Sequence, residues 1–527
     1  MKINIGLFTI VASVFLASCT SFLEENPRSE RDSENFFQDA TDAYSIVNRL
    51  YKKGVPERYN HSVWAGTHMM DGGYLSGLFD NTYKGQEVWI THSQTLTLDP
   101  TVDNNHLQTM WQSSYEAIIR TANFAINNIP ECPGLSEAER NRLIGEAKFF
   151  RALNYFYLVK AFGAVPIVTT TYTTIDDLYV KRSTEQKVYD FIVKDLTEAL
   201  SMGLADKSFP ENGFRISKGS VLALLADVYL NMAGYPIKDE SKYALAAEAA
   251  ESLINNANYE LIQHKDKGEN SAYNILRTSD NEKEYLYTIE YEAGIYEGGS
   301  RPMCCFPNVA ASWGEFKWSD CNNAYQPDPL LLSLYDESDD LRFQDHQYFH
   351  RSYKQRKGTQ ELREFGKPLP YFWWEEEAAL VTGVSVKDQV HYRLAEMYLI
   401  AAEALVRANN RVTAEAIDYL ATIKARASIN KDKSTIVSEL AMSNYSVEQF
   451  VQEVWKEKIR EFIFEMKIWN DITRTRKYPA LKSGEFNFVD LIGASNPYGH
   501  VFNEDNIYFP ICSQEMQRNP LLSEEPE

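Results

Sequence analysis

The stretch Tyr392–Leu405, YRLAEMYLIAAEAL, carries the clearest helical signal of the chain. Its large apolar positions recur at intervals of four, three and four residues and so share one face of an α-helix: Leu394, Tyr398, Ala401 and Leu405. The alanines between them favour the helix and let a neighbouring helix approach closely. Glu396 and Glu403 fall between the apolar positions, where we expect a solvated flank.

Two earlier stretches repeat this pattern. Leu225–Leu230, LADVYL, nearly copies Leu394–Leu399, LAEMYL, and Ala152–Leu158, ALNYFYL, is a looser version. Recurring helices of small residues and tyrosines are typical of tetratricopeptide-like hairpins, which bury their inner faces only by stacking on neighbours. The sequence therefore predicts an all-α-dominated fold, a tetratricopeptide-like helical-repeat scaffold with a few short strands.

The same periodicity divides the chain into scaffold and irregular regions. We expect helices over residues 35–53, 107–128, 136–162, 183–202, 217–232, 240–256, 391–408, 413–427 and, as one long helix, 447–474. The charges at 460–462 and 474–477 are predicted to lie on the solvated side of that last helix. Residues 54–106 and 257–390 lose the helical period and indicate loops with short strands. Irregular excursions of this size are usually functional or disordered, and the aromatic content argues against disorder, so we expect the binding face there.

The charge balance narrows the choice of partners. The chain of 527 residues has 53 basic and 74 acidic residues, a net charge of −21. Nucleic acids and anionic lipids need a basic face, so both are disfavoured as partners. Neutral ligands such as glycans stay open.

The N-terminus is predicted to be a lipoprotein signal peptide, residues 1–18. Lys2 precedes an apolar run, Ile3–Leu16, that is too short to span a bilayer. The run ends in Leu16-Ala17-Ser18-Cys19, which matches the lipobox of bacterial lipoproteins. We expect cleavage before a diacylated Cys19, a lipidated tether over 19–34 and one domain over 35–527. The alternative is an ordinary secretory signal with a chance cysteine.

Five further cysteines, an odd number, do not indicate a disulfide framework: Cys132, Cys304, Cys305, Cys321 and Cys512. Pairing of Cys321 with Cys304 or Cys305 stays open.

The usual signatures of enzymes are missing from the sequence: a Gly-x-Ser-x-Gly elbow, a Walker loop, His-Glu-x-x-His and Cys-x-x-Cys. His346 and His350 are four residues apart and could share a helix face as metal ligands, but no third ligand is evident nearby. Glu375–Glu377 and the acidic residues at 336–340 supply the paired carboxylates that a glycosidase needs, yet 74 acidic residues produce such pairs by chance. We predict no catalysis, cofactor or metal; a structural calcium ion cannot be judged from the sequence.

Aromatic residues of the irregular regions are the candidate binding residues. Sugars present apolar C–H faces flanked by hydroxyls, so a glycan site needs flat aromatic platforms with polar groups at their edges. The candidates are Tyr83, Trp89, Tyr296, Trp313, Trp318 and, as a polar neighbour, Asn322. For each aromatic residue, burial in loop packing is the alternative interpretation. The same question applies to Tyr325, Trp373 and Trp374.

The motifs together resemble those of the SusD/RagB family of outer-membrane lipoproteins from glycan-degrading Gram-negative bacteria. The matching pieces keep their order over nearly the whole chain: the lipobox with 35–37, 146–152 leading to 162–166, 215–219, 392–405, 458–465 with Trp469 and Asp471, and 508–511 with 519–520. One departure is Met466-Lys467, where the family commonly has Gly-His or Gly-Arg.

The resemblance implies a tetratricopeptide-like scaffold with an irregular ligand-binding face. It implies capture of oligosaccharides or polysaccharides at the cell surface and delivery to a partner, a SusC-like TonB-dependent outer-membrane transporter. By the same resemblance, Tyr296–Ser300 and Trp318-Ser319 occupy the positions of the stacking residues of the starch-binding member. A hydrolase of the same glycans, and a non-catalytic scaffold that binds proteins or peptides, are the alternatives.

Overall fold

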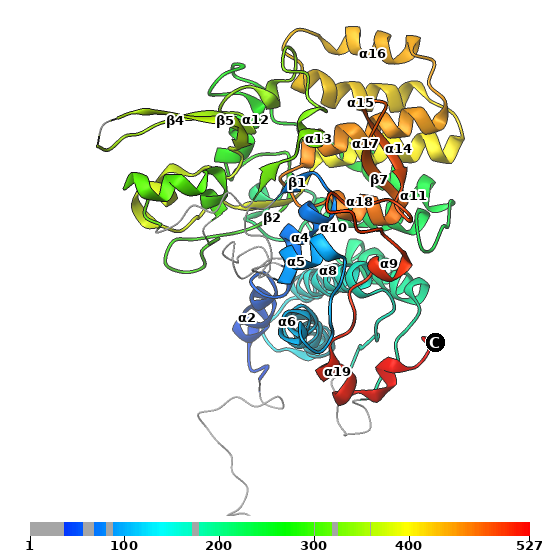
Figure 1. The fold of residues 1–527 in the computed structure, drawn as a ribbon. Helices are drawn as coiled ribbons and strands as arrows, with labels where there is room; N and C mark the ends of the chain where they lie inside the picture. Colours follow the sequence, from blue (N-terminus) through cyan, green and yellow to red (C-terminus); the bar gives the residue numbers. More distant parts are fainter. Residues whose placement is uncertain are drawn as a thin grey trace, which may run out of the picture.

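The computed structural model describes residues 36–55, 68–80, 88–170, 179–299, 301–318, 325–358 and 360–527. Stacked α-helices form most of the molecule, and the loops gather with the β4–β5 hairpin at the left of Figure 1. This arrangement confirms the predicted fold class. In the described residues, no helix has the length and apolar composition needed to cross a membrane.

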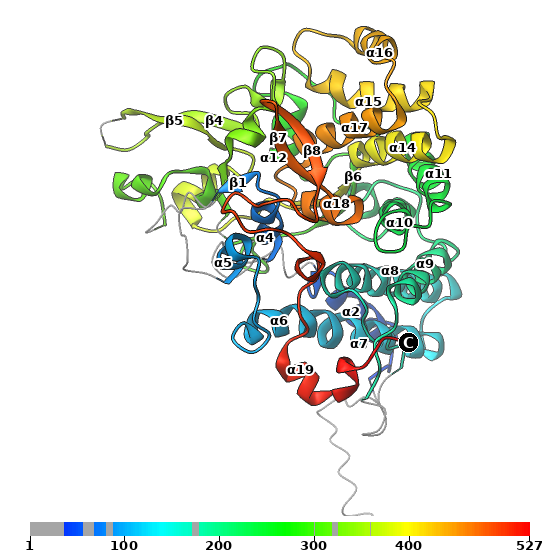
Figure 2. The ribbon, with the colours of Figure 1, turned by 45° about the vertical axis from the view of Figure 1, so that its right-hand side comes forward.

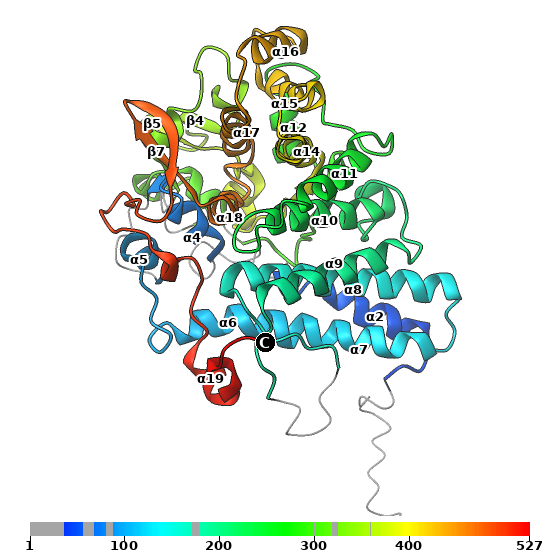
Figure 3. The ribbon, with the colours of Figure 1, turned by 90° about the vertical axis from the view of Figure 1, so that its right-hand side faces the viewer.

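The first part of the scaffold consists of helices from the N-terminal half of the chain. They are α2 (Ala40–Leu50), α6 (Asn104–Ser114), α7 (Arg120–Asn128), α8 (Glu137–Phe162) and α9 (Glu185–Leu200), with a π-helical turn between α6 and α7. Figure 3 shows α6, α7, α8 and α9 lying nearly side by side. Side-chain caps fix where α8 and α9 begin, because Ser136 and Thr184 accept hydrogen bonds from the backbone N–H groups of their first turns.

The second part of the scaffold holds the repeated motif. Its helices are α10 (Lys218–Ala233), α11 (Lys242–Ile254), α14 (Leu394–Asn409), α15 (Ala414–Ala427), α16 (Lys433–Met442) and α17 (Val447–Phe462). The two copies of the motif lie on α10 and α14, and both helices pack against α11 (Figure 2). Segments far apart in the sequence thus bury one another's apolar faces, as a helical-repeat scaffold requires.

The structure of the stretch Tyr392–Leu405 differs from its prediction in two respects. Tyr392 and Arg393 belong to strand β6 (Gln389–Arg393), and the helix begins only at Leu394. The predicted solvated flank is wrong, since Glu396 and Glu403 are 3% and 1% exposed. Because α10, α11, α15 and α17 all pack against α14, the helix has little solvent-facing surface, and both carboxylates are paired with cations instead.

The prediction of one long helix over 447–474 is also wrong. The segment forms two helices, α17 and α18 (Ile468–Thr475). Met466 lies in the break with a φ of +62°, a left-handed conformation that favours glycine. This is the position at which the motif departs from the family pattern.

Of the charges expected on the solvated side of that helix, Glu461 and Arg474 lie in the interior, whereas the others are half-buried. Glu461 is 1% exposed and takes part in a buried ionic network. We use this name for the following residues: Glu284, Asp340, Arg342, Arg393, Arg426, Glu457, Glu461 and Glu465. The network connects α17 with α15, β6 and the loop before β4, so it joins the scaffold to the irregular region.

The irregular regions contain short elements. They are α4 (His68–Leu75), β1 (Phe79–Asp80), α5 (Val88–Thr95), α12 (Ala272–Thr278), β2 (Tyr285–Ile289), β3 (Gln326–Pro327), α13 (Pro329–Leu332), β4 (Phe349–Lys354) and β5 (Leu362–Pro370). The helices α4 and α5 correct the prediction that 54–106 holds only loops and strands. The C-terminal part adds β7 (Lys477–Lys482), β8 (Glu485–Asp490) and α19 (Ser513–Arg518). All four described sheets are two-stranded and antiparallel: β1–β3, β2–β6, β4–β5 and β7–β8.

Candidate functional site

The irregular region has a small hydrophobic core of its own. Its buried members are Cys305, Phe306, Ala310, Tyr353, Trp374 and Ala379, and half-buried residues packed on it include Trp313, Phe316, Trp318, Phe365 and Tyr371. We call these residues the aromatic cluster. They come from the turns η5 (Arg301–Cys305), η6 (Asn308–Trp313) and η8 (Ala378–Thr382), from the segment up to Trp318, from β4 and β5, and from residues 371–374 after β5. Two candidate binding residues, Trp313 and Trp318, therefore lie at the margin of one cluster.

Trp318 is held in a fixed orientation. Its indole N–H donates to the carbonyl oxygen of Gly383 at 2.8 Å, and its ring stacks on Phe316 with centroids 6.2 Å apart. The side chain is only partly buried. An indole that is fixed at one edge, packed on one face and partly exposed has the properties of a stacking platform for a sugar.

Trp313 packs more tightly than Trp318. Its ring is nearly parallel to that of Tyr353, at 9° and 6.2 Å, and the Arg363 guanidinium lies 5.5 Å from its centroid. Glu315, between the two tryptophans in sequence, is buried and accepts hydrogen bonds from the Tyr353 hydroxyl and the Arg356 backbone N–H. Burial and the charge of Glu315 both raise the pKa of Tyr353. The carboxylate thus ties the β4–β5 turn to the tryptophan segment.

One short loop connects Trp318 with the turn that carries Tyr296. Gly383 accepts from Trp318, while two residues further on Ser385 exchanges backbone hydrogen bonds with Gly298 and Gly299, at 2.8 and 2.7 Å. Gly383 has a φ of +86°, which glycine adopts without strain. The loop Gly383–Ser385 therefore hydrogen-bonds both to Trp318 and to the turn that follows Tyr296.

The ring of Tyr296 has close neighbours of its own. Its hydroxyl donates to the carbonyl of Lys52 at 2.9 Å, and the Lys52 ammonium lies 4.7 Å from the ring centroid. The Tyr291 ring packs at 5.6 Å with a tilt of 37°. Part of the Tyr296 ring surface is therefore already in contact with Lys52 and Tyr291.

Several predicted residues fall outside this description. Tyr83, Asn322 and Cys19 lie outside the described residues, as does Cys321 with the disulfide question attached to it. Trp89 belongs to α5, but its side chain is not among those described. Of the further aromatic residues considered, Tyr325 and Trp374 are buried core residues at 0% and 7% exposure.

The histidines considered as metal ligands and the carboxylate Glu375 have other roles in the structure. His350 is buried on β4, where burial lowers its pKa to about 3, while His346 precedes the strand and is exposed beside Asp345, so the two share no helix face. Glu375 accepts hydrogen bonds from the Ser385 hydroxyl and the backbone N–H groups of Val386 and Lys387. It holds the loop beside Trp318.

Sequence reasoning missed Glu315 and the loop Gly383–Ser385, and it considered Glu375 only as one of several chance carboxylate pairs. Glu315 lies between two candidate tryptophans, and that position was the only local signal. The partners of all three lie beyond the reach of a helix or strand period, so motif spacing could not identify their roles.

A helical-repeat scaffold that carries a fixed, partly exposed indole has features expected of a binding protein. Two family models match the chain: one described as "Starch-binding associating with outer membrane" over residues 21–230, and the SusD family model over residues 375–527.

Several known proteins are similar to this chain over nearly its full length. A SusD-like protein of Formosa agariphila is 25% identical over 99% of this chain and 98% of its own, and one of Bacteroides ovatus is 22% identical over 100% and 98%. The crystal structure of a SusD superfamily protein from Parabacteroides distasonis matches with a TM-score of 0.79 and 27% identity over 92% of this chain and 98% of its own. Surface glycan-binding protein A from Bacteroides uniformis shares the fold, with a TM-score of 0.68 and 17% identity over 92% and 98%.

The chain belongs to the SusD/RagB family. Proteins of this family are non-catalytic binding proteins, which confirms the prediction that the chain is not an enzyme. It is a SusD-like carbohydrate-binding protein associated with the outer membrane.

Proposed function

We propose that the chain is a cell-surface lipoprotein that binds oligosaccharides at the aromatic cluster and delivers them to a SusC-like TonB-dependent transporter. The proposed location of the binding site rests on the orientation of Trp318. Its indole is fixed by Gly383 and Phe316 before any ligand arrives, so little conformational entropy is lost on stacking. Tyr296 and Trp313 are the neighbouring candidates, and Trp89, Tyr83 and Asn322 stay candidates from the sequence.

The expected affinity follows from the area of a stacked sugar. One sugar face on an indole hides about 50–80 Å² of apolar surface, which at about 25 cal/mol per Å² gives roughly 1–2 kcal/mol per platform. Two or three platforms supply about 2.5–6 kcal/mol in total, and the cost of ordering a flexible glycan reduces this, so stacking alone gives a Kd of about 1 mM or weaker. Binding of this strength suits a receptor that must release its ligand to a transporter.

The anchor and the delivery step have separate support. The lipobox at Leu16–Cys19 supports lipid attachment, and two acyl chains hold a protein stably at a membrane. The family description supports association with the outer membrane. A receptor needs a channel partner to import its ligand, and this supports the transporter complex.

A glycan screen with matched variants tests the binding site. Isothermal titration across plant, fungal and host oligosaccharides should identify a ligand, and Trp318→Ala should weaken its binding about tenfold, the loss of one platform. Trp374→Ala is the control for the cluster: this ring is 7% exposed, so the variant should lose about 3–5 kcal/mol of stability. Normal glycan binding by folded Trp318→Ala would place the site elsewhere, and a lack of any glycan ligand would contradict the proposed function.

A further inference from the structure

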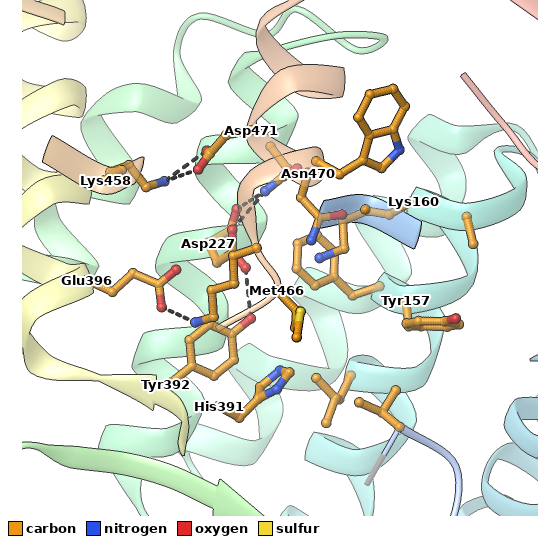
Figure 4. Close-up of a pocket in the computed structure, with 18 of the residues that line it drawn as sticks. Tyr157, Lys160, Asp227, His391, Tyr392, Glu396, Lys458, Met466, Asn470 and Asp471 are labelled. Atoms are coloured by element: carbon orange, nitrogen blue, oxygen red, sulfur yellow. Dashed lines mark hydrogen bonds and ion pairs between the residues drawn. The ribbon is translucent and has the colours of Figure 1, made fainter. Parts of the chain in front are cut away.

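A cavity of about 100 Å³ lies where α8, α10, α14 and α18 meet. None of its lining residues belongs to the aromatic cluster, and the proposed function makes no use of it. Figure 4 shows charged side chains from all four helices around the cavity. Its walls also contain aromatic rings, including those of Phe156 and Trp469.

Most charges around the cavity have partners. The Lys467 ammonium donates to Glu396, and that of Lys458 pairs with Asp471 at 2.8 Å. Asp227 differs, because its carboxylate accepts from the Tyr392 hydroxyl and from the Asn231 amide, each at 2.8 Å. Both donors are neutral, so in the described part of the chain Asp227 forms no ion pair.

Lys160 is the cation of the cavity lining that likewise forms no ion pair in the described residues. Its ammonium lies 3.8 Å from the centroid of the Phe156 ring, and no acceptor from the described residues hydrogen-bonds to it. Burial lowers the pKa of Lys160, and the charge of Asp227 acts in the opposite direction. Lys160 is half-buried and its ammonium is not among the fully buried polar atoms, so water can hydrogen-bond to it, and a ligand that enters the cavity can take the place of that water.

We propose that this cavity binds a small polyhydroxylated molecule, no larger than a single sugar ring, between Lys160 and Asp227. The lining holds three lysines and three acidic residues, so it favours a neutral ligand over an ion. A hydroxyl group can accept from an ammonium and donate to a carboxylate, so adjacent hydroxyls satisfy both Lys160 and Asp227. Phe156 and Trp469 would contact the C–H groups of such a molecule.

The cavity is too small to enclose an oligosaccharide of the proposed function. A cavity of about 150 Å³ takes a molecule the size of benzene, so about 100 Å³ suits a short polyol or one end of a monosaccharide. The cavity is therefore a separate site with a separate ligand. Its occupancy should not depend on Trp318.

Three proteins test the proposal: the wild type, Lys160→Met and the control Lys194→Met, in which an exposed lysine of α9 is changed. Each is titrated with glycerol, erythritol, D-xylose, D-glucose and D-galactose, with thermal melting and saturation-transfer NMR as readouts. We expect a saturable response to at least one probe in the wild type and in Lys194→Met, weakened at least tenfold in Lys160→Met. Without ligand, Lys160→Met should melt close to the wild-type temperature, because no acceptor in the described residues hydrogen-bonds to the half-buried ammonium. Trp318→Ala should keep the response, which separates this site from the glycan site.

Three results would overturn the proposal. One is a melting temperature of Lys160→Met clearly below that of the wild type, or a variant that does not fold, because the ammonium would then have a structural role. Another is an equal, non-saturating rise in melting temperature in all three proteins, which is the general effect of excluded osmolytes. The third is the lack of a saturable response to every probe in the wild type.

Discussion

Replacing Arg393 with methionine tests the buried ionic network. Arg393 is 0% exposed and donates to three carboxylates, with Nη1 at 3.0 Å from Glu284 and 2.8 Å from Glu461, and Nη2 at 2.8 Å from Glu465. Methionine keeps much of the volume of the side chain and removes all of these bonds. The carboxylates then depend on the other cations of the network.

The magnitude follows from which carboxylate loses its partner. Arg426 still pairs with Glu284 at 2.7 Å and with Glu461 at 2.6 Å, but in the described residues Glu465 forms an ion pair with Arg393 alone. Arg393→Met therefore leaves one buried carboxylate uncompensated. Breaking a buried pair in this way costs about 3–5 kcal/mol of unfolding free energy at neutral pH.

The pH dependence of this loss has a definite sign. Burial raises the pKa of Glu465 even in the wild type, and without Arg393 it should rise further. An acid whose pKa is raised in the folded state destabilises the protein above that pKa, and the loss disappears as the pH falls to the unfolded value. For Glu461, burial is outweighed by Arg426, Arg393 and Arg342, which lower its pKa, so that stabilisation is lost only below the unfolded pKa of about 4.3 and does not change between pH 7 and pH 5. The difference between the two proteins should therefore be smaller at pH 5 than at pH 7.

Urea unfolding, followed by tryptophan fluorescence at pH 7 and pH 5, measures both effects. The control is Arg411→Met, which changes an exposed arginine just beyond α14 and should alter stability by less than about 0.5 kcal/mol. The reasoning is refuted if Arg393→Met loses less than about 1 kcal/mol at pH 7, or if its deficit grows at pH 5.

Three further predictions concern the anchor, the partner and a strained turn. Cys19→Ala should release the protein from the membrane fraction without changing glycan affinity; a variant that still requires detergent for extraction would contradict lipid attachment. Co-purification from native membranes in mild detergent should recover a β-barrel transporter, and recovery of the monomer alone while the barrel is expressed would count against delivery. Ser483→Gly should raise the unfolding free energy by about 1 kcal/mol, because Ser483 has a φ of +54° in the β7–β8 turn; a lower melting temperature would show that the serine side chain matters more than the strain.

The sequence determined the local elements and the class of fold. Helix α8 begins after Ser136 and ends at Phe162, before Gly163, because a capping box and a left-handed glycine act within one turn of the chain. The copies of the motif on α10 and α14 indicated stacking, since neither helix could bury its small residues alone. The motifs that resemble those of SusD/RagB proteins indicate the family from the sequence alone.

Tertiary contacts alone decided which charges are buried and where the candidate site forms. Glu396 and Glu403 occupy helix positions that are polar by pattern, yet other helices cover them and supply Lys467 and Arg474 as partners. Trp318 and the Tyr296 turn meet at the loop Gly383–Ser385 through hydrogen bonds between distant segments. The physical reason is the range of the interactions: capping and periodicity act over a few residues, whereas burial, ion pairing and loop contacts depend on groups that only the folded chain brings together.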